Sequence, residues 1–232
     1  MYPEYLYNND TQDMSRRVQA LAAKDEPALR AHCLEVSRQT DTSSLAVQKD
    51  CIAKVGAAHA VLANMVRVLK ELSQTLASRA GVFHTQNGQA DFPVVCRAVT
   101  EIEEARGQLL SCVGDLTQAR HTLASCVADA NRTLHLLSLA VQFVPESARS
   151  HYVAATEQTK VAYTLMTGLD GDVREALNSY MTFIERHLPA FMERLRSAAD
   201  FNHAGAALDP TAIRTLCGEL FILAERLQNV SF

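Results

Sequence analysis

Residues 92–144 read FPVVCRAVTEIEEARGQLLSCVGDLTQARHTLASCVADANRTLHLLSLAVQFV, and this stretch decides the fold. Apolar side chains return every three or four residues for seven heptads without a slip. With the heptad lettered a to g, the d positions are Val95, Ile102, Leu109, Leu116, Leu123, Ala130, Leu137 and Val144. A heptad pattern of this length predicts one long helix, over about 93–144, that packs along other helices.

The positions beside this stripe indicate how the helix packs. Position a holds Arg106 and Arg120 among apolar residues, whereas position g is small throughout: Ala98, Ala105, Cys112, Ala119, Cys126, Thr133 and Ala140. Two-stranded coiled coils usually carry charges at g. Small residues there widen the buried face instead and let a neighbouring helix approach closely. We therefore expect a hairpin inside a bundle rather than an isolated coiled-coil dimer.

A second long helix is expected over about 42–80, where Gly81 supplies the stop. Small residues again accompany its stripe: Cys51, Gly56, Ala58, Ala63 and Ala77. Shorter helices are expected over about 11–24, after Asp25, over about 147–167, from Val173 to about Phe201 with a bend at Pro189, and after Pro210. A turn is expected at 168–172. The predicted fold class is all-α: an elongated antiparallel helical bundle with two long helices (about 42–80 and 93–144) in a coiled-coil-like hairpin, plus shorter helices.

The composition fits one globular domain over residues 11–232, preceded by a flexible N-terminal arm over residues 1–10. The chain has 232 residues, of which 48% are hydrophobic, and only 9 glycines and 6 prolines. Its six cysteines form no CxxC pair, which favours reduced thiols in the cytoplasm. Neither a signal peptide nor an apolar run of membrane-spanning length is expected.

The charge distribution argues against nucleic acid as a partner. The formal net charge is -4, and the lysines and arginines form no basic cluster. Proteins that bind nucleic acid usually concentrate positive charge on one segment, because neutralising phosphates provides most of their affinity.

No pattern of catalytic, metal-binding or cofactor-binding residues is present. The chain has no Glu-x-x-His or His-Glu-x-x-His pair for a metal, and no glycine-rich loop for phosphates. We therefore expect no enzymatic activity, no metal and no cofactor.

Five residues are candidates for interaction with a partner. Arg106 and Arg120 occupy a positions, where a charge either extends along its aliphatic stem to the bundle edge or meets acidic residues of another helix or partner chain. Tyr2, Tyr5 and Tyr7 in the N-terminal arm offer amphipathic anchors, although such an arm is also compatible with an inert terminus.

His59 lies at an a-like position of the second long helix. A core histidine with a hydrogen bond to a neighbour is the simpler interpretation. Because histidine titrates near neutrality, a role in sensing pH stays open.

These features favour a non-catalytic helical interaction or scaffold protein, a subunit or adaptor in a larger assembly or a homo-oligomer. Protein partners or self-association are expected. Two alternatives remain: a helical protein on a membrane surface, of curvature-binding or pore-forming type, which the lack of basic clusters disfavours, and a ligand-binding bundle with a pocket between helices.

Overall fold

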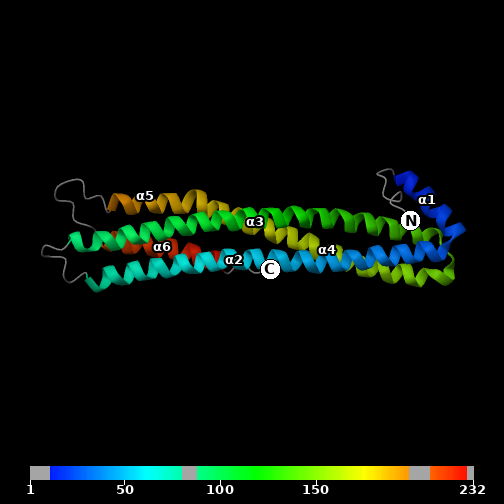
Figure 1. Cartoon of the computed structure of the whole chain (residues 1–232), viewed down its shortest axis with the longest axis horizontal. Helices are drawn as coiled ribbons and strands as arrows, with labels where there is room; N and C mark the ends of the chain where they lie inside the picture. The colour runs from blue at the N-terminus through cyan, green and yellow to red at the C-terminus, as the bar shows by residue number, and fades with distance from the viewer. Residues whose placement is uncertain (1–10, 80–87, 199–209, 229–232) are drawn as a thin grey trace. The chain divides into compact units, whose positions relative to one another are not determined.

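The chain is all-α in the computed structural model, which describes residues 11–79, 88–198 and 210–228. The elements are α1 (Thr11–Lys24), α2 (Glu26–Arg79), α3 (Gly88–Phe143), α4 (Glu146–Thr182), the π-helical turn η2 (Phe183–His187), α5 (Leu188–Ala198) and α6 (Pro210–Gln228). The described ranges contain no strand (Figure 1). The predicted fold class is therefore confirmed at the level of an all-α helical bundle, and the coiled-coil-like hairpin stays a prediction.

The chain divides into two compact units. Unit 1 comprises residues 1–51 and 119–172, and unit 2 comprises residues 52–118 and 173–232. The helices α2, α3 and α4 each contribute one stretch to each unit. The expectation of a single domain over 11–232 stays a prediction.

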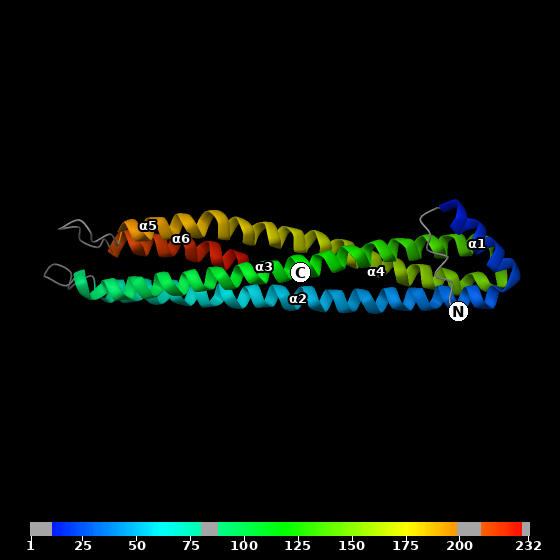
Figure 2. The same ribbon diagram turned by 45° about the horizontal axis from the view of Figure 1, so that its top comes forward.

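Unit 1 combines α1 with stretches of α2, α3 and α4 (Figure 2). Buried apolar side chains of these helices form one cluster. Met14 and Val18 of α1 belong to the same buried cluster as Leu29 of α2, Leu137 of α3 and Tyr152 of α4. The phenol of Tyr152 donates a hydrogen bond to Glu26 Oε1 at 3.1 Å. Burial and this contact raise the pKa of Tyr152 far above its usual value.

Buried hydroxyl groups link the three long helices inside unit 1. Ser37 of α2 donates to the Ala155 carbonyl of α4 at 3.1 Å and lies 2.8 Å from the Thr159 hydroxyl. Thr40 of α2 lies 3.4 Å from the Thr133 hydroxyl of α3. Since buried polar groups are costly unless they are hydrogen-bonded, these contacts fix the register of the helices in unit 1.

Unit 2 contains stretches of α2, α3 and α4 with η2, α5 and α6. Here α5 and α6 lie side by side (Figure 2). Ion pairs join its helices at the surface: Arg67 of α2 with Glu101 of α3 (3.7 Å), Arg196 of α5 with Glu103 of α3 (2.6 Å), and Arg194 of α5 with Glu219 of α6 (2.9 Å).

The buried residues of α3 do not follow the a and d positions of the heptad. All eight d positions are buried, and five of the seven g positions are buried as well. Of the a positions only Val113 is buried, and the others are half-buried. The centre of the stripe therefore runs between d and g, and position a, with Arg106 and Arg120, lies at its edge.

The predicted boundary near Asp41 does not exist, because α2 runs without a break through it. The hydroxyls of Thr40 and Thr42 donate to the carbonyls of Val36 and Arg38, four residues earlier. In that arrangement they cap no new helix. The start of α2 was predicted correctly, since Asp25 Oδ1 accepts a hydrogen bond from the Ala28 amide at 3.1 Å.

The predicted turn at 168–172 is also wrong: these residues lie inside α4. The irregularity occurs later, at η2, which ends two residues before Pro189. Proline has no N–H for the carbonyl four residues back, and a π-helical turn is one way to accommodate that loss within a helix. The helices at 11–24 and after Pro210 are confirmed, and α3 begins five residues before the expected start at 93.

Candidate interaction surface

An exposed apolar surface lies on the stretch of α2 in unit 2. Its side away from the core consists of small apolar residues with one larger one at its margin. Ile52 is 50% exposed, and the other members are also exposed: Ala53, Gly56, Ala57, Ala60 and Ala63. We call these six residues the α2 face. The charged residue within this span is Lys54, which is half-buried and lies beside the α2 face. The face itself therefore carries no charged side chain.

The opposite side of the same helix packs into unit 2. Val55, Ala58, Leu62 and Met65 are all buried there, at spacings of three and four residues. The helix is therefore apolar on both sides. Among the described residues, α2 is the one helix that is long and apolar enough to cross a membrane. One stretch of 18 residues within it has a mean hydropathy of 1.4, and 39% of that stretch is buried. A soluble helix that is apolar all round is ordinarily covered on all sides.

Gly56 makes the α2 face flat without being required by the packing of the chain. A β-carbon at this position would meet nothing within 4 Å. Glycine inside a helix is destabilising by about 0.5–1 kcal/mol relative to alanine. The open space shows that no neighbouring group in the described part of the chain requires glycine at this position.

Charged residues border the α2 face at both ends. Lys49 and Asp50 are exposed before it. Arg67 follows it, and its guanidinium contacts Glu71 of the same helix at 2.7 Å and Glu101 of α3 at 3.7 Å. An apolar surface with a polar rim is the usual arrangement of a protein interface.

Arg106 and Arg120 share a heptad position but have different surroundings. In unit 1, Arg120 Nε donates to Asp170 Oδ1 of α4 at 2.9 Å, and Asp170 is only 18% exposed. Arg120 thus meets an acidic residue of another helix of its own chain. In unit 2, Arg106 is half-buried, and its Nε atom is buried without a hydrogen-bond partner in the described part of the chain. The role of either arginine toward a partner stays a prediction.

The tyrosines of the N-terminal arm, Tyr2, Tyr5 and Tyr7, lie outside the described residues. Their expected role as anchors also stays a prediction.

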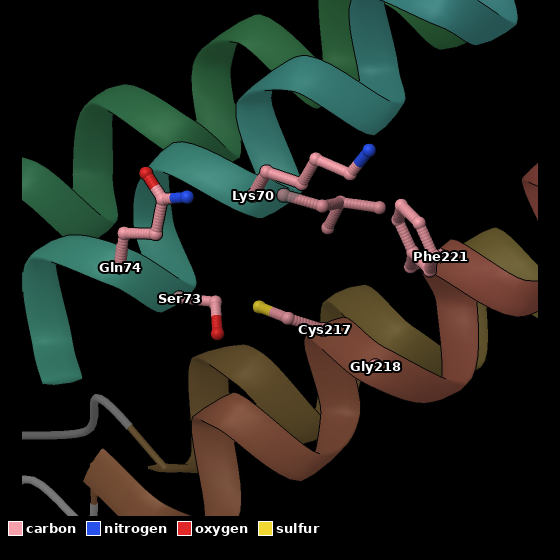
Figure 3. A pocket seen from close by; sticks show the side chains of 7 residues that line it. Lys70, Ser73, Gln74, Cys217, Gly218 and Phe221 are labelled. Carbon is pink, nitrogen blue, oxygen red and sulfur yellow. The ribbon is translucent and has the colours of Figure 1, made fainter.

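Two shallow grooves flank α6 within unit 2. The first has a volume of about 270 Å³ and lies between α2 and α6 (Figure 3). Lys70 Nζ lies 4.7 Å from the centre of the Phe221 ring, and the Cys217 thiol points across the groove toward Ser73. Burial raises the pKa of Cys217 to about 12, so this thiol stays protonated near neutral pH and is a poor nucleophile.

The second groove, of about 360 Å³, lies between α6 and the end of α4 with η2. Its lining mixes apolar side chains such as Phe183 and Leu223 with the charged or titratable side chains of Glu175, His187 and Arg226. No group of three His, Cys, Asp or Glu side chains within residues 11–79, 88–198 and 210–228 could hold a metal ion.

His59 is half-buried on α2 in unit 2. Burial lowers the pKa of His59, and the backbone of Leu227 has a smaller effect in the opposite direction. The ring meets Tyr180 of α4 edge-on, with the ring centres 6.4 Å apart. The Nε2 atom of His59 is buried without a hydrogen-bond partner in the described part of the chain, and the expected hydrogen bond of a core histidine stays a prediction.

The sequence contains a signal for the α2 face. The small residues of this helix suggested close packing inside the bundle, and Cys51 and Ala58 are indeed buried. Gly56, Ala63 and Ala77 are exposed instead. A run of Ala and Gly on the side opposite the leucine stripe would have predicted an exposed small-residue face.

No protein-family model matches this chain, and neither a curated protein nor a solved structure matches it significantly. The fold and the α2 face define the class of protein directly: an all-α helical bundle with an apolar helix face exposed on its surface.

Proposed function

We propose that this chain is a non-catalytic interaction module, a subunit or adaptor that binds a helix of a protein partner or of a second copy through the α2 face. The observation that carries the proposal is the exposure of a helix side composed of Ala and Gly with Ile52 at its margin. An exposed apolar patch with a polar rim commonly marks a protein interface.

The residue types on this face favour a helix as the occupant. Ala and Gly let the backbones of two helices approach closely, so that many weak van der Waals contacts form along the crossing. Membrane binding depends on buried apolar area and on attraction to anionic lipids. A face of Ala and Gly presents little apolar area, and Lys49 and Arg67 at its ends form no basic cluster.

Photo-crosslinking in the native source tests the proposal. A benzophenone amino acid at Ala57, in the centre of the α2 face, should form a discrete protein adduct. The matched control is the same probe at Gln108, which is exposed on α3 in the same unit. A specific adduct from position 57 and none from position 108 is the expected result. Equal labelling from both positions would contradict the proposal.

A charge placed on the face provides the second arm. Ala57→Arg should release the partner and reduce the size of the native complex, whereas Gln108→Arg should not. Both positions are exposed and helical, so both variants should keep the helical circular dichroism of the parent.

Liposome co-sedimentation separates this proposal from the membrane alternative. The chain should stay in the supernatant with anionic vesicles at low salt. Strong sedimentation that Ala57→Arg abolishes would identify the α2 face as a membrane-binding surface instead.

A further inference from the structure

The groove between α2 and α6 in unit 2 has apolar side chains from both helices in its lining. Leu69 of α2 and Cys217 of α6 are buried there, and the half-buried ring of Phe221 lies on the same helix as Cys217. Figure 3 shows the Phe221 ring and the Cys217 thiol projecting from α6 toward α2. The groove therefore offers an apolar surface against which a hydrocarbon group can be buried.

The polar groups of the groove come from one side of α2. Lys70 and Gln74 are exposed and Ser73 is half-buried, and their spacing of three and four residues places them on one helix face. In the described part of the chain, Lys70 contacts the Phe221 ring, and none of these three side chains makes an ion pair or a hydrogen bond. An ammonium, a hydroxyl and a carboxamide thus keep their hydrogen-bonding capacity for a ligand or water.

The positive charge of Lys70 has no carboxylate partner in the groove. None of the described residues that line it is acidic. Glu71, next to Lys70 in the chain, pairs with Arg67 at 2.7 Å, and Glu219 of α6 pairs with Arg194 at 2.9 Å. Both neighbouring carboxylates are thus neutralised by other cations. An anion that enters the groove meets an attractive charge and no repulsive one.

Gly218 keeps the α6 side of the groove open. It is exposed and lines the groove, and a β-carbon at this position would meet nothing within 4 Å. Glycine weakens a helix, and no described neighbour requires it here. The space above Gly218 is therefore free for a bound molecule, and a large side chain at the same position would occupy it.

We propose that the groove between α2 and α6 binds an amphipathic monocarboxylate of the class of medium-chain fatty acids. Lys70 and Gln74, one helical turn apart, bind the carboxylate at the rim. The hydrocarbon chain covers Leu69 and Phe221 and fills the open space at Gly218. This site uses none of the residues of the α2 face, so it is a second binding function beyond the proposed one.

The size and charge of the groove favour this class of ligand over others. Its volume of about 270 Å³ lies at the lower end of sites for small molecules, which suits a short chain. A phosphate group is usually held by several cations or by the free amides of a helix N-terminus. Lys70 is the one cation among the described residues that line this groove, and a single cation matches a monocarboxylate.

Titration of the ¹⁵N-labelled full chain with sodium octanoate, followed by NMR at neutral pH, tests the proposal. Amide signals of residues 69–74 and 217–221 should shift and saturate together. Octanamide has the same chain without the charge, and it should bind at least about fivefold more weakly, because a charged acceptor makes the stronger hydrogen bonds.

Two pairs of variants assign the binding to the groove. Gly218→Leu should abolish octanoate binding by filling the open space, whereas Gly114→Leu, at an exposed glycine of α3 in the same unit that is equally open, should not. Lys70→Gln should weaken octanoate about fivefold to tenfold and leave octanamide unchanged, and Lys160→Gln, at an exposed lysine of α4, is its control. All four positions are exposed and helical, so circular dichroism should stay that of the parent.

Several results would overturn the proposal. Absence of saturable shifts at about 10 mM octanoate would show that the groove has no useful affinity for this class. Equal affinities for octanoate and octanamide would exclude recognition of the carboxylate. Octanoate binding that persists in Gly218→Leu, or shifts confined to residues 52–63 and lost in Ala57→Arg, would place the ligand outside the groove.

Discussion

Two arginines at the same heptad position behave differently because the neighbouring helices differ. Arg120 faces Asp170, which is 50 residues away in the sequence and belongs to the same unit. Arg106 is half-buried with its Nε unsatisfied in the described part of the chain. The heptad pattern places both arginines at position a and does not distinguish them. Because their surroundings differ, loss of charge should change the free energy of unfolding in opposite directions at the two positions.

We expect the pair of Arg120 and Asp170 to stabilise unit 1 modestly. A double-mutant cycle with Arg120→Met and Asp170→Asn should give a coupling energy of about 0.5–1 kcal/mol, because both groups keep some contact with solvent. Urea unfolding at low and high salt measures it. The coupling should shrink at high salt, and a coupling of zero at low salt would show that the pair contributes nothing to stability.

Arg106→Met should instead raise the free energy of unfolding by up to about 1 kcal/mol. Methionine keeps an apolar stem of similar width and removes a buried donor that has no acceptor. Urea unfolding of this variant beside Arg120→Met provides the comparison. Destabilisation by Arg106→Met would mean that this guanidinium makes a favourable contact in solution.

At the level of single elements, the continuity of α4 is the main departure from the expected structure. Gly168 and Gly171 gave the segment the composition of a turn, yet both lie inside a helix of 37 residues. The helix continues because apolar residues on either side of the segment remain in helical register: Met166 and Val173 are both buried. Burial of the flanking residues outweighs the weak helix propensity of two glycines.

Gly168→Ala and Gly171→Ala should therefore each stabilise the protein by about 0.5–1 kcal/mol. Both positions are exposed, and a β-carbon at either would meet nothing within 4 Å. Thermal and urea unfolding check this. If the segment were a turn with left-handed backbone in solution, the same substitutions would destabilise the protein.

For the whole molecule, the buried cysteines provide reporters in both units. Cys33 and Cys51 are fully buried in unit 1 and Cys217 is 2% exposed in unit 2, whereas Cys96 is exposed. Burial raises the pKa of Cys33 and of Cys217 to about 12, which further suppresses their reaction. At about pH 8, a thiol reagent should therefore modify Cys96 rapidly and the three buried thiols only after unfolding.

Labelling along a urea series then tests whether the chain unfolds as one domain. Because α2, α3 and α4 each contribute to both units, we expect Cys33 and Cys217 to become reactive at the same urea concentration. The sites are identified by peptide mass spectrometry. Two separate midpoints would show that the units are independent domains and would contradict the expectation of a single domain over 11–232.

The sequence by itself determined the helical class and several helix limits. Apolar residues at intervals of three and four, with few glycines and prolines, permit little else. Local chemistry was sufficient where a side chain acts on its own backbone, as Asp25 does at the start of α2 and Pro210 at the start of α6.

Only the tertiary structure decided which sides of the helices are buried. In α3 the d and g positions are apolar or small, and the a positions are apolar except for Arg106 and Arg120, so the position of the neighbouring helices selects d and g. In α2 both sides are apolar, and packing covers the side with Leu62 and leaves the α2 face with Gly56 exposed. Burial depends on contacts between residues far apart in the chain, and a periodic pattern along one helix contains no information about them.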